Sequence, residues 1–349
     1  PGTGHPGTAG HPAGPSRLAA GWDHVVAVAT TLVVLAVLVT VPGGCGPAGT
    51  GTGRAAAGDR PAGGSGSGTA PPVRSTRATS PAPVHPPYPV AEVTVALVDT
   101  SRPTVSGGDT ISPHRALTTL VWSPAVPGRW PLVVFGHGFQ VGPPPYETLL
   151  RSWAAAGFVV AAPEFPLTDE AVAGASLDEN DIQNQPADVR FVADALIATA
   201  SPLSSHIDPT RVAVAGHSDG AATALDASIT TPPPGMPAFR AVIAMSVAPL
   251  IGLSSTGNPP ILVTQGDADT VNDPSLGYQT WDRAASPKYL DVLRGGSHLA
   301  PLEAGSAWLP GIEAVTVAFL DAFVAGDGPV SAIAAAGASS PGLASLRSG

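Results

Sequence analysis

Short apolar runs that alternate with helical segments are the feature that most constrains the fold of this chain. From residue 90 onward, runs such as 131–135 and 158–162 contain almost no polar residue. A strand has this composition when both of its faces are covered, as in a parallel sheet with helices on both sides. We therefore predict an α/β fold with a doubly wound, mostly parallel sheet.

The same patterns locate the individual elements of the folded region. Strands are predicted at 91–99, 116–122, 131–135, 158–162, 211–215, 241–247, 261–265 and 289–293, and helices at 146–156, 181–200, 221–229, 275–285 and 312–324. Only about twelve residues separate the strand at 241–247 from the next strand. We therefore expect no large lid domain over the carboxyl edge of the sheet.

Composition divides the chain into four parts. Residues 42–89 are rich in Gly, Pro, Ser and Thr and have almost no large apolar side chains, which predicts a disordered linker. Residues 1–41 are predicted to be a signal or anchor region, and residues 90–327 the folded domain. The small residues of 328–349 predict a disordered tail.

The N-terminal part suggests export from the cytoplasm. An apolar run at 25–41 follows Arg17 and precedes Cys45, the only cysteine of the chain. Three interpretations remain open: a cleaved secretory signal, a lipoprotein signal with Cys45 acylated, or an uncleaved membrane anchor. Each predicts a secreted protein or one anchored to a bacterial-type cell envelope. With a single cysteine, no intramolecular disulfide can form.

Charge argues against a nucleic-acid partner. The formal net charge is −10 at pH 7, and Lys288 is the only lysine. A nucleic-acid surface needs clustered basic residues, which this chain lacks. We also find no metal-binding or nucleotide-binding motif, and expect neither a metal nor an organic cofactor. We expect a monomer.

Residues 216–220, Gly-His-Ser-Asp-Gly, match the pattern Gly-x-Ser-x-Gly. They follow a predicted strand and open a predicted helix, as in a tight turn that presents a nucleophilic serine. Side chains at Gly216 and Gly220 would collide across such a turn, and the His217 side chain should point away from the nucleophile. Ser218 is therefore the candidate nucleophile, and a glycine-rich surface turn is the alternative.

A serine hydroxyl needs an adjacent base, which in turn needs an orienting acid. His298 is the only histidine after Ser218 and lies in a glycine-bearing loop after the strand at 289–293. The acid should follow the strand at 261–265, where Asp267, Asp269 and Asp273 all lie close in sequence. Asp269 is our first choice and Asp267 the second, while an Asx turn is the structural alternative for either.

Two backbone N–H groups should hold a developing oxyanion. One is that of Asp219, directly after the candidate nucleophile. The other should come from the turn after the strand at 131–135, where Phe139 is the best candidate. The Asp219 carboxyl would oppose an oxyanion if it pointed inward, so we expect it to be turned away. His137 in this turn is interpreted as a structural brace.

These blocks together resemble the α/β-hydrolase superfamily. Its nearest branch includes dienelactone-hydrolase-like proteins, chlorophyllases, platelet-activating-factor acetylhydrolases and bacterial cutinase or polyester hydrolases. The resemblance rests on 135–139, 156–163, 216–220, 266–271 and 295–298. It implies that the acid is the Asp before a Thr-Val step, which is Asp269, and that Phe139 contributes an oxyanion N–H.

The resemblance implies a serine hydrolase that cleaves carboxylic esters through an acyl-enzyme. The substrate could be a small soluble ester, a lipid or a polyester. Residues 246–250 lack the aromatic platform usual in polyester hydrolases, so polyester cleavage is not favoured. The alternatives are an amide or peptide hydrolase with the same three residues, or a surface-anchored binding protein that keeps the fold without turnover.

Overall fold

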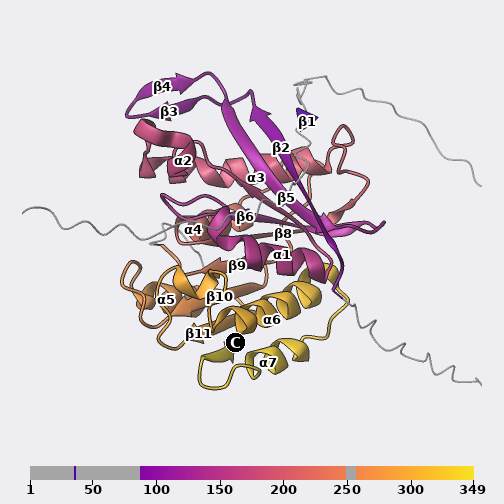
Figure 1. The fold of residues 1–349 in the computed structure, drawn as a ribbon, viewed down its shortest axis with the longest axis vertical. Coiled ribbons are helices and arrows are strands. Elements are labelled where there is room, and N and C mark those ends of the chain that lie inside the picture. The colour runs from indigo at the N-terminus through magenta and orange to yellow at the C-terminus, as the bar shows by residue number, and fades with distance from the viewer. Residues whose placement is uncertain (1–34, 37–86, 249–256) are drawn as a thin grey trace, which may run out of the picture. The chain divides into compact units, whose positions relative to one another are not determined.

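A computed structural model describes residues 35–36, 87–248 and 257–349 of the chain (Figure 1). All of them belong to the unit that spans residues 33–349. Ten of the described strands form one sheet in the order β1-β2-β5-β7-β6-β8-β9-β10-β11-β12. The six strands from β7 to β11 in this order run parallel to one another. The predicted mostly parallel α/β sheet is thereby confirmed.

The sheet and its helices have the following bounds. The strands are β1 (Leu35–Ala36), β2 (Val90–Asp99), β5 (Arg115–Pro124), β6 (Trp130–Gly136), β7 (Val159–Pro163), β8 (Ile207–His217), β9 (Val242–Met245), β10 (Ile261–Gly266), β11 (Lys288–Leu293) and β12 (Ala344–Ser348). The α-helices are α1 (Glu147–Ala156), α2 (Glu170–Ala173), α3 (Gln185–Ile197), α4 (Asp219–Ile229), α5 (Pro274–Arg283), α6 (Leu309–Leu320) and α7 (Ser331–Gly337).

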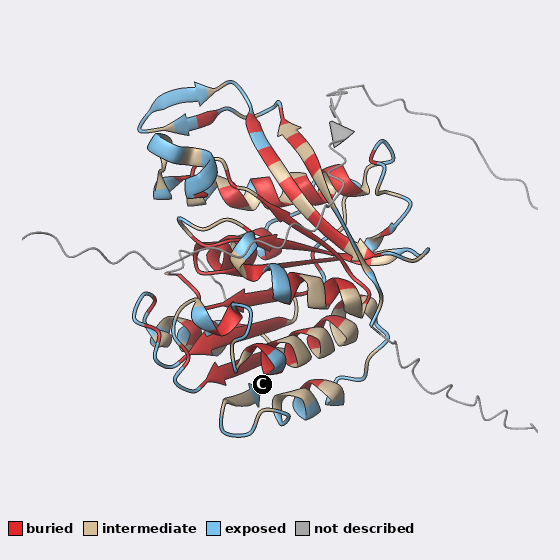
Figure 2. Ribbon diagram, viewed as in Figure 1, coloured by how far each residue is buried: buried red, intermediate tan, exposed pale blue. Residues whose placement is uncertain are grey.

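Two apolar layers sandwich the sheet. Alternate residues of β6 enter opposite layers: Leu132 and Val134 pack with α3 and α4, whereas Val133 and Phe135 pack with α1 and α6. The central strands are accordingly buried along most of their length (Figure 2). Burial on both faces explains why these strands are continuous apolar runs in the sequence.

Proline and glycine set several helix boundaries. Helix α1 ends at Gly157, whose φ of 113° stops the helix as its sequence predicts. Helix α3 begins at Gln185 and not at residue 181, because Pro186 occupies the first turn, where a missing N–H is tolerated. The preceding residues form the 3-10 helix η3 (Glu179–Asn184).

The end of the chain corrects one prediction. Residues 328–349 were expected to be a disordered tail, but they contain α7 and β12. Strand β12 pairs antiparallel with β11, and Ile333 of α7 is fully buried. Pairing with an existing strand edge satisfies the backbone of β12, so this segment needs few large apolar side chains to be ordered.

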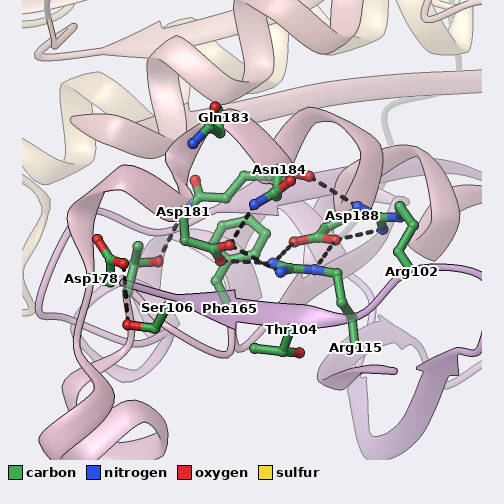
Figure 3. A network of polar contacts seen from close by, with 12 residues as sticks. Arg102, Thr104, Ser106, Arg115, Phe165, Asp178, Asp181, Gln183, Asn184 and Asp188 are labelled. Carbon is green, nitrogen blue, oxygen red and sulfur yellow. Dashed lines mark hydrogen bonds and ion pairs between the residues drawn. The ribbon is translucent and has the colours of Figure 1, made fainter. Parts of the chain in front are cut away.

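A small hairpin and a buried charge network lie beside the antiparallel end of the sheet. The hairpin, β3 (Thr104–Ser106) and β4 (Asp109–Ser112), is largely exposed (Figure 2) and was not predicted. At the start of β5, the Arg115 guanidinium binds the carboxylates of Asp181 and Asp188 at 2.6–3.0 Å (Figure 3). This contact fixes η3 and α3 against β5.

Most of the predicted signal or anchor region and of the predicted linker lies outside the described residues, as does Cys45. The described exceptions are Leu35–Ala36 and the last three linker residues, 87–89. Leu35–Ala36 form β1, which pairs parallel with β2. Within the described part of the chain, no helix has both the length and the apolar character needed to cross a membrane.

Candidate active site

Ser218 lies on a tight turn between β8 and α4. Its backbone has φ 58° and ψ −120°, a conformation that non-glycine residues rarely adopt and that costs about 1–3 kcal/mol. A Cβ at Gly216 would lie 2.0 Å from the Gly220 carbonyl oxygen, and one at Gly220 would lie 2.1 Å from that of Gly136. Only glycine fits at these two positions, so the turn presents Ser218 at the carboxyl edge of the sheet.

The His298 imidazole bridges Ser218 and Asp269. Its Nε2 lies 3.0 Å from Ser218 Oγ, and its Nδ1 lies 2.8 Å from Asp269 Oδ2. The Asp269 side chain is fully buried, while that of His298 is 16% exposed. The fold therefore brings His298 together with two residues that lie 29 and 80 positions away from it in the sequence.

The three candidate aspartates have different contacts. Asp269 Oδ1 accepts from the Val271 and Asn272 N–H groups, both at 2.9 Å. Burial raises the pKa of Asp269, but the hydrogen bonds from His298 and these N–H groups outweigh burial and hold the pKa below its ordinary value. Asp269 is therefore a carboxylate at neutral pH.

The other two aspartates make local structural contacts. Asp267 is exposed and accepts from the Gly295 N–H at 2.6 Å, and Asp273 accepts from the Ser275 N–H at the start of α5. Neither has a hydrogen bond to His298 among the described contacts. Of the three, Asp269 alone contacts the imidazole in the described structure.

Close backbone packing positions the His298 loop. A Cβ at Gly266 would lie 2.2 Å from the Gly296 carbonyl oxygen, so the end of β10 and this loop meet backbone to backbone. The Ala268 N–H donates to the same Gly296 oxygen at 3.0 Å. Glycine at 266 thus allows the Asp269 loop and the His298 loop to lie in direct contact.

The loop after β6 packs against the serine turn. A Cβ at Gly138 would lie 3.2 Å from Ser218 Cβ, which shows how near the two backbones are. The next residue, Phe139, is half-buried, and Gln140 is held with φ 67° by a bond from its N–H to the Thr168 carbonyl. The two predicted oxyanion donors, Phe139 and Asp219, therefore lie on segments that flank Ser218.

His217 has a role that sequence reasoning missed. It is fully buried, and burial lowers its pKa to about 3, so the ring is neutral. Its Nε2 lies 2.9 Å from the His298 carbonyl oxygen, which can only accept, so Nε2 carries the proton. Its Nδ1 accepts from the Tyr146 hydroxyl at 2.9 Å, and that hydroxyl also accepts from the Gly138 N–H. His217 thus connects the loops of Gly138 and His298.

His137 is a structural brace, in agreement with its interpretation from sequence. Its Nε2 accepts from the Phe165 N–H at 3.0 Å, and its Nδ1 donates to the Gly138 carbonyl at 2.9 Å. Burial lowers its pKa and keeps the ring neutral. Both nitrogens are occupied by backbone groups.

The Asp219 carboxyl is the least satisfied polar group near Ser218. It is 6% exposed, and its Oδ2 has no hydrogen-bond partner among the described residues. Burial, followed by repulsion from Glu179, raises its pKa to about 6. Electrostatic attraction by His298 lowers the pKa of Asp219 but is the smaller effect.

Two further polar residues contact this cluster. Asn272 Nδ2 lies 3.4 Å from Ser218 Oγ and 2.9 Å from the Ser246 carbonyl oxygen. Ser246 has a φ of 46°, and its Oγ donates to the His298 carbonyl at 3.3 Å. The sequence signal for either is position only. Ser246 lies at the carboxyl end of the predicted strand 241–247, where functional residues gather in parallel sheets, and Asn272 lies in the loop of Asp269.

A comparison with protein families identifies the family of this chain. The model of the family described as Chlorophyllase matches residues 91–275, just over half of the chain. The chain belongs to the chlorophyllase family. This family is part of the α/β-hydrolase superfamily, and membership implies hydrolase activity on esters. The match contains Ser218 and Asp269 but stops before His298, whose place is known from the structure alone.

No curated protein matches the chain. Among the described residues, no group of three or more His, Cys, Asp and Glu side chains is arranged to hold a metal ion.

Proposed function

We propose that the chain is a serine carboxylic-ester hydrolase in which Ser218 is the nucleophile, His298 its base and Asp269 the acid that orients the base. The observation that carries this proposal is the position of the imidazole, with Ser218 Oγ at 3.0 Å on one nitrogen and Asp269 Oδ2 at 2.8 Å on the other. A proton can pass directly between the hydroxyl and the ring at this distance. Family membership supports ester cleavage.

The contacts support one assignment of hydrogen-bond donors and acceptors before reaction. Asp269 is ionised and accepts from His298 Nδ1–H, which leaves the lone pair of Nε2 directed at Ser218. As Oγ attacks the ester carbonyl carbon, its proton moves to Nε2. The buried carboxylate stabilises the imidazolium that forms.

The tetrahedral intermediate carries a negative oxygen that the Phe139 and Asp219 N–H groups would hold. Loss of one such donor typically costs about 2.7–4 kcal/mol of transition-state stabilisation. His298 then returns the proton to the departing alcohol, leaving an acyl group on Ser218. Water repeats the sequence and releases the carboxylic acid.

The substrate remains a prediction from sequence. The connection between β9 and β10 is short, although its residues 249–256 lie outside the described structure. A short connection leaves no room for a large lid, so the site would be open. An open site would accept small soluble esters or lipids that need no enclosure.

Covalent labelling tests the proposal. A fluorophosphonate probe should label the wild-type protein and fail to label Ser218→Ala. With p-nitrophenyl butyrate, Ser218→Ala and His298→Ala should each lower kcat by about a million-fold, and the double variant should lose no more. Circular dichroism of each variant provides the control for folding.

Two results would contradict the proposed ester hydrolysis. A folded wild-type protein that is neither labelled nor active would favour a binding protein with this fold. Faster turnover of a p-nitroanilide than of the matched p-nitrophenyl ester would favour amide hydrolysis on the same residues.

A further inference from the structure

The orientation of the Asn272 side chain is fixed by its partners. Its Nδ2 lies 2.9 Å from the Ser246 carbonyl oxygen, and a carbonyl only accepts, so nitrogen and not oxygen faces that group. The same nitrogen lies 3.4 Å from Ser218 Oγ. An amide nitrogen carries two hydrogens, one for each acceptor. The Ser218 hydroxyl directs its own proton to His298, so Oγ accepts from Asn272.

Asn272 is also held rigidly. It is 8% exposed, and its backbone N–H donates to Asp269 Oδ1 at 2.9 Å. Its acceptor, Ser246, is itself fixed by an N–H bond to the Thr264 carbonyl at 2.8 Å and by its left-handed backbone. The amide is therefore preorganised beside the nucleophile, on a segment that also binds the acid.

We propose that Asn272 is a catalytic residue that donates a hydrogen bond to Ser218 Oγ and speeds the release of the acyl group. This inference rests on the proposed function and adds a donor that acts on the leaving oxygen. It differs from the oxyanion donors, which act on the carbonyl oxygen.

The chemistry of acyl release explains why a donor is needed at Oγ. Water attacks the acyl carbon and gives a proton to His298 Nε2. The intermediate then collapses: the C–Oγ bond breaks, its electron pair returns to Oγ, and the Nε2 proton follows. Negative charge builds on Oγ while the bond breaks, and the Asn272 N–H lies against that atom.

The same donor affects the two half-reactions unequally. Before acylation, Oγ is a hydroxyl oxygen that already accepts well, so the hydrogen bond gains little as attack begins. Before deacylation, Oγ is an ester oxygen, a weaker acceptor, so the bond strengthens more on the way to the transition state. Only interactions that strengthen in the transition state accelerate a step. Loss of Asn272 should therefore slow deacylation more than acylation.

Pre-steady-state kinetics can separate the two steps. A suitable substrate is p-nitrophenyl trimethylacetate, because its hindered acyl group prolongs the acyl-enzyme and gives a measurable burst of p-nitrophenolate. In Asn272→Ala, deacylation should fall about tenfold, the effect of one hydrogen bond to a charged atom, while acylation falls no more than about twofold. Consequently kcat and KM should fall together, with kcat/KM nearly unchanged.

Two further variants serve as controls for this test. Asn272→Asp keeps the size of the side chain but removes the N–H donor, and it should slow deacylation at least as much. Asn258→Ala removes an amide that also bonds to backbone groups, at Pro259 and Ala285, and should leave both rates unchanged. Thermal unfolding of each variant shows whether it is folded.

The outcomes distinguish this inference from the proposed function. If wild type turns over and Ser218→Ala does not, yet Asn272→Ala and Asn272→Asp deacylate at the wild-type rate, the role of Asn272 is refuted and the proposed function stands. Equal losses in acylation and deacylation would also refute it. If folded wild type releases no p-nitrophenolate at all, both proposals fail.

Discussion

Two buried polar clusters in this chain are built in opposite ways. In the Arg115 network, the guanidinium and both of its carboxylate partners are almost fully buried, and each carboxylate is paired (Figure 3). Around Ser218, the imidazole is partly exposed and the backbone of Ser218 is strained. The neighbouring Asp219 keeps a carboxylate oxygen with no partner in the described structure.

The difference separates a structural role from a chemical one. A fully satisfied network fixes one arrangement of the chain and leaves no group free to react. Strain and unmatched polar atoms persist only where the surroundings impose them, and they are concentrated at functional sites. The Arg115 network also holds η3, the element that places Glu179 near Asp219.

Of the predictions that test this comparison, removal of the acid at the Ser218 site should give the largest effect. Asp269→Ala should lower kcat about 10⁴-fold, because the imidazole loses both its orientation and its counter-charge. Asp267→Ala removes only a bond to the Gly295 N–H and should cost less than about tenfold. Initial rates with p-nitrophenyl butyrate measure both. The opposite ranking would overturn the assignment of the acid.

Breaking the Arg115 network tests the structural role assigned to that cluster. Arg115→Met leaves Asp181 and Asp188 buried without their main partner, which should lower the free energy of unfolding by about 3–5 kcal/mol. The matched control is Arg151→Met, whose ion pair with Glu92 is exposed and should contribute at most about 1 kcal/mol. Urea denaturation measures both. Equal losses would mean that the buried network is no more important than a surface pair.

The parts of the site that the sequence predicts are those fixed by local backbone requirements. Gly216 is predictable because a side chain there collides with the backbone of Gly220, four residues further along the chain. Strands such as β6 can be predicted from the sequence because burial on both faces excludes polar residues. These constraints are local, and they suffice to place Ser218 at the carboxyl edge of the sheet.

The remainder depends on contacts between segments far apart in the chain. His217 contacts the His298 carbonyl across 81 positions, and Asn272 contacts Ser218 across 54. Arg115 reaches Asp188 across 73 positions. No local pattern encodes such pairs, and strand β12 likewise became ordered only through its pairing with β11.

The unmatched carboxyl of Asp219 gives the smallest and most specific prediction. Its pKa is raised to about 6 by burial and then by Glu179, from an ordinary value of 3.8. The folded state therefore binds this proton more tightly than the unfolded state, so stability falls as pH rises from about 4 to about 6 and is level above that. An asparagine side chain has no such proton to lose, so Asp219→Asn should gain stability over wild type across this range.

Thermal unfolding of wild type and Asp219→Asn between about pH 4.5 and pH 8 measures this gain. The variant should melt about 2–4 °C above wild type at pH 8, for about 1 kcal/mol, and the gap should narrow as pH falls below about 6. Asp282→Asn, on the exposed side of α5, is the control substitution of the same kind.

Asp219→Asn keeps the backbone N–H at residue 219. A stabilised variant that still hydrolyses esters would therefore show that the charge is dispensable for the oxyanion contact. A gap that is constant with pH would mean that Asp219 is not held in an unfavourable charged state.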